Sequence, residues 1–289
     1  MQSRSSEPTS PYEQRPVLVV GSTGKTGRRV VERLASRGLP VRHGSRRAPI
    51  PFDWDDPQTW APALDGVRSA YVTFHPDLAV PGAPAAIERF SRLATEAGVQ
   101  RLVLLSGRGE AEAQRCERIV AASGATWTVV RASWFAQNFS EAFLLDAIVD
   151  GTVALPVDDV REPFVDADDI ADVAVAALTT DDLVDRVVEV TGPRLMTFAE
   201  AVGEIADATG RDVRFLRIPH EDFLEGLGRA GVPENAAGLL DFLFREVLDG
   251  RNASLTNGVE EALGRPARDF REYVARTVST GVWSTEVAR

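Results

Sequence analysis

The chain has 289 residues, 44% of them hydrophobic, which is enough to bury one large core or a core with a smaller lobe. A formal net charge of −11 argues against a nucleic-acid partner held by a basic surface. No apolar run approaches the ~18 residues of a membrane helix, and the single cysteine, Cys116, suits a reducing compartment. We expect a cytoplasmic monomer or homodimer that contacts neither membrane nor nucleic acid.

The first structured segment is an apolar strand over residues 16–20 that leads through a glycine-rich turn into a helix over 25–37. The glycines follow the spacing G-x-x-G-x-x-G, which permits a tight turn and leaves the N–H groups of the helix N-terminus free for a diphosphate. The residues predicted to hold a dinucleotide are Gly21, Ser22, Thr23, Gly24, Lys25, Thr26 and Gly27. A P-loop is excluded because Val19 stands where that motif needs glycine.

Strands and helices alternate from there to residue 131. The expected strands cover residues 39–43, 68–74, 101–106 and 126–131. The expected helices cover residues 57–64, 84–97 and 110–122. This alternation predicts an α/β fold with a Rossmann-type, doubly wound parallel sheet, and the short apolar strands suit a sheet covered on both faces.

Beyond residue 131 the alternation loosens and the chain becomes mostly helical. Helices are expected over 134–149, 168–178 and 198–209 and through most of 220–280, with extended segments over 163–165, 187–190 and 213–218. The expected organisation is a disordered tail over 1–15, a nucleotide-binding Rossmann domain over 16–155, and over 156–289 the remaining sheet elements with a smaller substrate-binding lobe.

The loop after the second strand indicates which nicotinamide cofactor is bound. NAD-binding folds place an acidic residue there for the ribose 2′-hydroxyl, but residues 33–52 contain no Asp or Glu. Arg46, assisted by Ser45 or Arg47, instead matches a 2′-phosphate, which a guanidinium binds and a carboxylate repels. NADP(H) is therefore favoured, the alternative being a solvated basic loop in an arginine-rich chain.

Strand ends supply further cofactor contacts. Asp53 can accept from the adenine amino group and Trp54 can flank the base, although Asp53 equally suits a turn or helix-entry carboxylate. Thr73 and Phe74 end the third strand near the nicotinamide ribose, and Ser106 ends the fourth beside the nicotinamide.

One expected catalytic pair is missing. Most short-chain dehydrogenases use a tyrosine with a lysine four residues later, and the lysine lowers the pKa of the phenol. The tyrosines here, at 12, 71 and 273, are followed at that spacing by Pro16, His75 and Thr277. Either the protein performs no redox chemistry or its reaction does not need that proton donor.

Several motifs together resemble the NmrA-like atypical short-chain dehydrogenase/reductases. They are the turn at 21–27, Phe-Asp-Trp at 52–54, Leu-Leu-Ser-Gly at 104–107, Val-Arg-Ala-Ser-Trp-Phe-Ala-Gln-Asn-Phe at 130–139 and Phe-Val-Asp-Ala-Asp-Asp-Ile-Ala at 164–171. Segments 59–64 and 80–83 look closer still to bacterial relatives of the festuclavine and agroclavine dehydrogenases of ergot alkaloid biosynthesis. The resemblance spans about 16–280 and is specific for fold and cofactor, but not for substrate.

The resemblance implies that the 21–27 turn, Arg46 and Phe74 hold NADP(H). It also implies a pocket for a small-molecule substrate, lined by Trp134, Phe135, Asn138 and Phe139. The three aromatic rings can stack on a flat substrate or attract a cation. The alternative is that these rings belong to the hydrophobic core. The family includes reductases and non-catalytic redox-sensing regulators, and both are compatible with the missing pair.

A reductase without the Tyr–Lys pair is expected to act on an imine, an iminium ion or a conjugated C=C/C=O bond, because hydride addition to an iminium ion needs no proton. If a proton is needed, His75 and Ser106 are the candidate donors, and Arg108 can polarise a carbonyl oxygen. No His/Cys/Asp spacing suggests a metal site.

Overall fold

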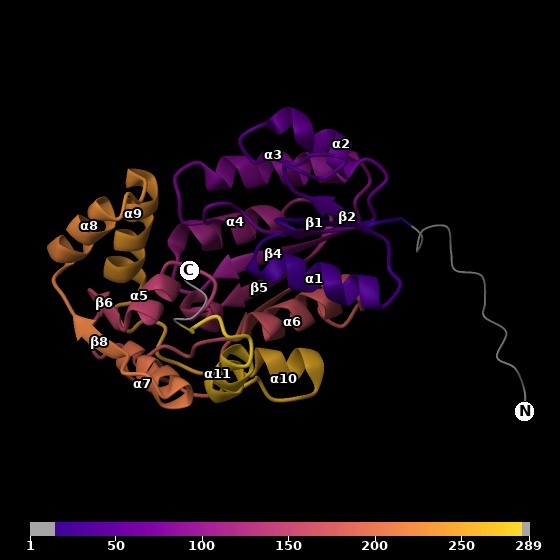
Figure 1. Ribbon diagram of the computed structural model, residues 1–289. Coiled ribbons are helices and arrows are strands. Elements are labelled where there is room, and N and C mark those ends of the chain that lie inside the picture. The colour runs from indigo at the N-terminus through magenta and orange to yellow at the C-terminus, as the bar shows by residue number, and fades with distance from the viewer. Residues whose placement is uncertain (1–14, 285–289) are drawn as a thin grey trace, which may run out of the picture.

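The computed structural model describes residues 15–284 and is built on a six-stranded parallel sheet (Figure 1). In spatial order its strands are β2 (Val41–Gly44), β1 (Val17–Val20), β3 (Ser69–Val72), β4 (Arg101–Gly107), β5 (Thr126–Ala132) and β7 (Arg186–Val190). The chain leaves β1 for β2 on one side and returns for β3 on the other, which opens a crevice at the carboxyl ends of these strands. The predicted α/β doubly wound fold is confirmed.

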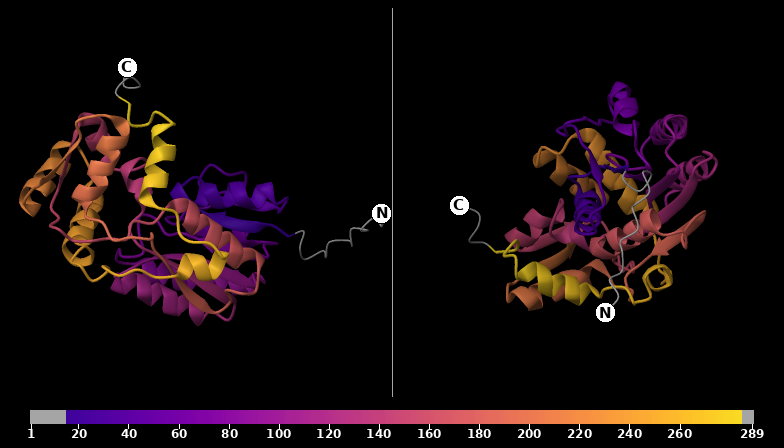
Figure 2. Two further views of the ribbon diagram at one scale, coloured as in Figure 1. Left: turned by 90° about the horizontal axis from the view of Figure 1, so that it is seen from below. Right: turned by 90° about the vertical axis from the view of Figure 1, so that its right-hand side faces the viewer.

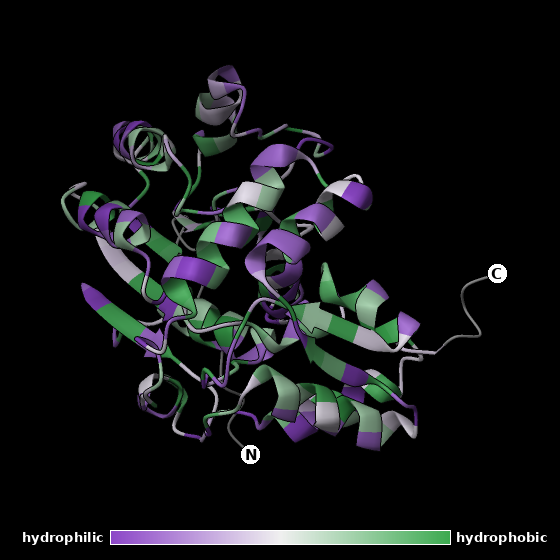
Figure 3. Ribbon diagram, turned by 90° about the vertical axis from the view of Figure 1, so that its left-hand side faces the viewer, coloured by the Kyte–Doolittle hydropathy of each residue, from purple (hydrophilic) through white to green (hydrophobic). Residues whose placement is uncertain are grey.

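Helices cover both faces of this sheet (Figure 1). One layer contains α1 (Lys25–Ser36), α6 (Ala167–Thr179) and α10 (Gly258–Leu263), and the other η1 (Pro57–Thr59), α2 (Trp60–Leu64), α3 (Ala83–Glu96) and α4 (Ala111–Ala121). Every residue of β1 is buried, because its alternate side chains enter two different cores. Figure 3 shows the same pattern, with apolar strands inside and polar residues on the outer faces of helices.

A second, smaller lobe lies at the carboxyl end of the sheet (Figures 1 and 2). It contains η2 (Ala136–Phe139), α5 (Leu144–Asp150), β6 (Thr152–Leu155), α7 (Phe198–Thr209), β8 (Arg214–Arg217), α8 (His220–Arg229), α9 (Glu234–Phe242), η3 (Leu243–Val247) and α11 (Phe270–Val278). Strands β6 and β8 pair in parallel, and a separate aromatic core includes Phe139, Phe164 and Phe198.

Two predictions of local structure are wrong in this lobe. The helix expected over 134–149 is split into η2 and α5, because the carbonyl of Phe139 accepts from Trp283 Nε1 (2.8 Å), whereas a continuous helix needs it to accept from the N–H of Phe143. Residues 163–165 form no strand but one bridge, between Phe135 and Val165, and β6 was not foreseen. The predicted tail lies outside the described residues apart from Arg15, whose Nε donates to the carbonyl of Gly66 (3.1 Å).

Candidate cofactor and substrate site

The glycine-rich turn is where the ends of three strands meet. Gly21 has φ +68°, and its N–H donates to the carbonyl of Gly44 at the end of β2 (2.8 Å). A Cβ at Gly21 would lie 2.3 Å from Thr73 Oγ1, just beyond β3, and one at Gly27 would lie 2.1 Å from the carbonyl oxygen of Gly21. Glycine is therefore needed at both positions to close the turn.

The turn leaves hydrogen-bond donors free. The N-cap of α1 is Gly24, which offers no capping side chain, and the first turn of the helix contains no acidic residue. Ser22 is buried, and its Oγ has no hydrogen-bond partner within residues 15–284. An uncapped helix N-terminus beside an orphaned hydroxyl fits the diphosphate of a dinucleotide. Lys25 begins α1, and burial lowers the pKa of its ammonium group.

Arg46 is exposed, and among the described residues it forms neither a hydrogen bond nor an ion pair. It stands two residues after Gly44, whose carbonyl holds the first glycine of the turn. The loop is closed beneath it, because the carbonyl of Ser45 accepts from the N–H groups of Ala48 (3.2 Å) and Phe52 (3.0 Å). The guanidinium of Arg46 is thus available to a ligand, on a loop whose first residues contact the turn.

Asp53 and Trp54 connect this loop to the end of β3. Asp53 Oδ1 accepts from the N–H of Asp55 (3.2 Å), which matches the turn role left open for this carboxylate. Trp54 Nε1 donates to the carbonyl of Thr73 (2.9 Å), and its ring packs on Phe74 with centroids 4.8 Å apart. Trp54 is thus fixed against Thr73 and Phe74, which line the small cavity at the end of β3.

A cavity of about 320 Å³ lies between the sheet edge and the second lobe, and we call it the edge cavity. Its polar lining residues are Lys25, Asp77, Arg108, Glu110, Ser133, Asn138, Glu162 and Asn252. Its apolar lining residues are Pro76, Ala132, Trp134, Phe135, Ala142, Phe143, Leu240, Leu243, Val247 and Leu248. One cavity is thus shared by the cofactor turn, which contributes Lys25, and by four predicted substrate residues: Arg108, Trp134, Phe135 and Asn138.

Three other predicted residues are absent from this lining. Phe139 has no exposed surface and packs on Phe164 in the core of the second lobe, with centroids 5.4 Å apart. His75 is exposed at the surface. Ser106 lines a smaller cavity of about 90 Å³ together with Thr73 and Phe74, and Asp77 and Phe135 border both cavities.

Ser106 and Arg108 belong to a buried polar chain. Ser106 Oγ donates to Glu117 Oε1 (2.6 Å), and Arg131 bridges Glu117 and Glu189. Arg108 lies 3.4 Å from Glu189 and also donates to the carbonyls at Asn252 (3.2 Å) and Ser254 (3.1 Å) and to Ser254 Oγ (3.0 Å). Its donors therefore fasten the 252–254 segment over the sheet edge.

The sequence analysis did not predict that three acids line the edge cavity: Asp77, Glu110 and Glu162. Asp77 and Glu110 are hydrogen-bonded to each other, and the carboxyl group of Glu110 occupies space that a Cβ at Gly107 would fill, 2.1 Å from Oε1. Burial raises the pKa of both acids, and the charge of Asp77 raises that of Glu110 further. Both follow ends of neighbouring parallel strands, which is the signal that predicts their proximity. Glu162 carries no comparable signal.

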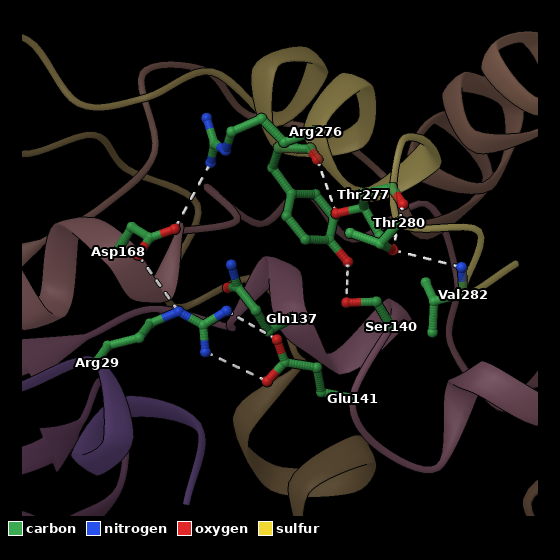
Figure 4. Close-up of a pocket in the computed structure, with 10 residues that line it drawn as sticks. Arg29, Gln137, Ser140, Glu141, Asp168, Arg276, Thr277, Thr280 and Val282 are labelled. Carbon is green, nitrogen blue, oxygen red and sulfur yellow. Dashed lines mark hydrogen bonds and ion pairs between the residues drawn. The ribbon is translucent and has the colours of Figure 1, made fainter. Parts of the chain in front are cut away.

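A second cavity, of about 260 Å³, differs from the first in that its charges are already paired (Figure 4). Arg29 pairs with Glu141 (2.7 Å) and with Asp168 (3.4 Å), and Tyr273 donates to Ser140 Oγ (2.7 Å). The edge cavity, where buried polar atoms lack partners, is therefore the better candidate for ligand binding.

Residues 15–284 contain neither a metal-ligand cluster nor a helix that could span a membrane. Nowhere in this range do three His, Cys, Asp or Glu side chains gather as metal ligands would. No helix there is both long and apolar enough to cross a membrane.

Residues 21–181 match the model of a family described as NAD(P)H-binding. Prestalk A differentiation protein A of Dictyostelium discoideum is 28% identical, over 91% of this chain and 92% of its own length. NAD(P)H azoreductase of Xenophilus azovorans is 30% identical over 89% and 96%, and agroclavine dehydrogenase of Claviceps fusiformis is 28% identical over 90% and 96%.

Among solved structures, the NADPH-dependent quinone oxidoreductase of Escherichia coli in complex with NADPH has the same fold. It superposes with a TM-score of 0.74 at 19% identity and covers 91% of this chain and 99% of its own. The family match covers more than half of the chain, and the azoreductase is related over nearly all of it. The chain therefore belongs to the NAD(P)H-binding family, and agroclavine dehydrogenase, to whose family the sequence motifs pointed, is among its relatives.

Proposed function

We propose that the protein is an NADPH-dependent reductase of a small organic molecule, transferring hydride to a C=N bond or a conjugated C=C/C=O bond. The observation that carries the proposal is the edge cavity, which joins the cofactor turn to a largely apolar and aromatic space. The bound cofactor supplies the hydride. The chain's own residues bind and orient both molecules and keep water away.

NADPH is proposed over NADH because of Arg46. Its guanidinium is free and next to the turn, and no carboxylate between residues 33 and 52 is available for a ribose 2′-hydroxyl. The hydrogen bonds from Ala48 and Phe52 to the carbonyl of Ser45 fix the loop that carries Arg46, which supports a role for this arginine at the 2′-phosphate.

The proposed substrate class depends on which proton donors line the edge cavity. Tyr71 is buried in the sheet and Tyr273 donates to Ser140, so no tyrosine of residues 15–284 lines the edge cavity. An iminium ion needs no proton when hydride adds to it. A neutral imine or a conjugated carbonyl needs one, and the candidate donor is the Asp77–Glu110 pair on the cavity wall, whose pKa values burial raises.

The relatives support a reductase, since those named azoreductase and agroclavine dehydrogenase span nearly the whole chain. A redox-sensing regulator of the NmrA type is the alternative that the sequence leaves open. A regulator does not need a substrate cavity beside the nicotinamide, and the 320 Å³ of the edge cavity favours the enzyme.

The test is NADPH oxidation by the purified protein with four substrates: 3,4-dihydroisoquinoline, its N-methyl iminium ion, cyclohexenone and cyclohexanone. We expect turnover with the first three and little with the saturated ketone, which lacks conjugation. Gly24→Val is the control that should abolish cofactor binding and hence all turnover. Tight NADPH binding without turnover of any substrate would contradict the proposal and favour the regulator.

A further inference from the structure

Glu162 is a buried acid without a partner. The residue is 1% exposed, lines the edge cavity, and its Oε1 accepts no hydrogen bond within residues 15–284. Its backbone is held by two hydrogen bonds with Met196, of 2.8 and 3.0 Å, so the side chain is attached to a fixed point of the wall. An unpaired buried carboxyl group costs stability, and a ligand that supplies the missing partner removes that cost.

The neighbouring charges do not satisfy Glu162. Burial raises its pKa to about 7, Arg108 acts in the opposite direction, and Asp249 raises it further. Arg108 is the nearby cation, but its donors serve the carbonyls at Asn252 and Ser254, and it forms an ion pair with Glu189. The remaining charged groups on the cavity wall are Lys25 and the pair Asp77–Glu110, whose two carboxyl groups are hydrogen-bonded to each other, so Glu162 is the acid of this wall that lacks a hydrogen-bond partner among the described residues.

Aromatic side chains share the wall with this acid. Trp134 and Phe143 both line the edge cavity, and the indole N–H of Trp134 is a second buried polar atom without a partner among the described residues. Aromatic faces combined with a carboxylate form the environment that recognises organic cations.

We propose that Glu162 is the counter-ion for a positively charged nitrogen on the substrate, which lies against Trp134. The inference rests on the proposed reductase function and narrows it to substrates that carry a cationic nitrogen, such as iminium ions, or that acquire one by protonation. Glu162 is a binding residue in this assignment, and hydride transfer does not pass through it.

The test compares two ligands of nearly equal shape that cannot accept hydride, phenyltrimethylammonium and tert-butylbenzene. Their binding to the full chain saturated with NADPH is measured by calorimetry or by tryptophan fluorescence. We expect the wild-type protein to bind the cation about tenfold more tightly than the isostere, and Glu162→Gln to remove that preference. The control is Glu96→Gln, which removes an equal charge from the exposed end of α3 and should preserve it.

A pH titration of the wild-type protein keeps the test decisive if Glu162→Gln does not fold. Because the Glu162 carboxyl group ionises near neutrality, cation binding should weaken about tenfold between about pH 8.5 and about pH 5.5, while binding of the isostere stays constant. The same weakening in Glu110→Gln separates Glu162 from the Asp77–Glu110 pair, which shares the cavity wall. Equal affinity for both ligands, or a preference that survives Glu162→Gln, would overturn the assignment. Reduction of the four substrates is measured separately, so failure of the reductase proposal and failure of this one are distinguishable.

Discussion

Gly24 and Gly27 stand three residues apart in one turn, yet the space around them differs. A Cβ at Gly27 would lie 2.1 Å from the carbonyl oxygen of Gly21, whereas one at Gly24 would lie 3.2 Å from it. Gly24 also has an extended backbone, with φ −78° and ψ 177°, which any residue adopts. A side chain at Gly24 therefore strains the turn less than one at Gly27, and we expect it to interfere mainly with the cofactor.

We expect Gly24→Val to fold and to lose NADPH affinity by more than about tenfold, because its side chain occupies the diphosphate position. Gly27→Ala should lose about 1–3 kcal/mol of stability as well, because the turn itself must move. Thermal unfolding and calorimetric titration separate the two effects. Unchanged NADPH binding in Gly24→Val would refute the placement of the diphosphate.

Arg46 provides the second test at this scale. We expect Arg46→Ala to weaken NADPH binding about tenfold to a hundredfold and to leave NADH binding almost unchanged, because only NADPH carries the 2′-phosphate. Parallel titrations with both cofactors measure this. Arg92→Ala, which removes an exposed arginine from α3, is the matched control. Equal losses for both cofactors would assign Arg46 a general role.

At the residue scale, the sequence predicted the groups that follow a motif and missed those that do not. The glycines and Arg46 have fixed positions relative to the first strand, so their location could be foreseen. Glu162 reaches the edge cavity through a loop bridged to Met196, which no local pattern shows. Phe139 follows the cavity residue Asn138 in the sequence but packs into the core of the second lobe, where its ring contacts the rings of Phe164, Phe198 and Phe270.

At the scale of elements, helices α1 and α6 are joined by ion pairs. Arg33 on α1 pairs with Asp168 (2.7 Å) and with Asp172 on α6, and both acids are about three-quarters buried. Burial alone would raise the pKa values of Asp168 and Asp172. The hydrogen bonds and the charge of Arg33 instead hold both pKa values below the usual range. These pairs therefore stabilise the fold only while the acids are ionised.

We expect Arg33→Ala to reduce the free energy of unfolding by about 1 kcal/mol at neutral pH. The acids have lower pKa values in the folded than in the unfolded state, so this stabilisation is complete above about pH 4 and is lost as the pH falls through the folded values. The difference between wild type and variant should thus shrink in urea titrations at about pH 3. A difference independent of pH would show that packing, not charge, joins the helices.

Prediction of elements failed where distant segments decide the local structure. Residues 134–149 have helical periodicity throughout, but a hydrogen bond from Trp283 ends the first turn at Phe139. Strand β6 pairs only with β8, whose residues follow about sixty positions later, so its four residues carry too little signal alone. The strands of the large sheet were foreseen because their burial on both faces makes them continuously apolar.

At the scale of the whole molecule, the two lobes are not independent along the chain. After the second lobe begins, the chain returns to supply α6 and β7 to the large sheet, and Arg108 of the sheet edge holds the 252–254 segment. Unfolding one lobe therefore exposes the core of the other.

We expect one cooperative thermal transition, which coincides when followed by tryptophan fluorescence and by circular dichroism. Because NADPH binds only the folded chain, a concentration about 100 times its Kd should stabilise the protein by about 2.7 kcal/mol and raise the whole transition. Two transitions, of which only the first moves with NADPH, would show that the lobes unfold separately.

Lys25 is the one lysine of the sequence, and it lies at the cofactor turn with a lowered pKa. An amine-reactive reagent at mild pH would therefore acylate this side chain and otherwise only the α-amino group. Mass spectrometry of intact protein would report cofactor occupancy directly, because a bound dinucleotide shields that nitrogen from the reagent. Because arginine replaces lysine everywhere else in the chain, acylation of Lys25 can serve as a direct measure of cofactor binding.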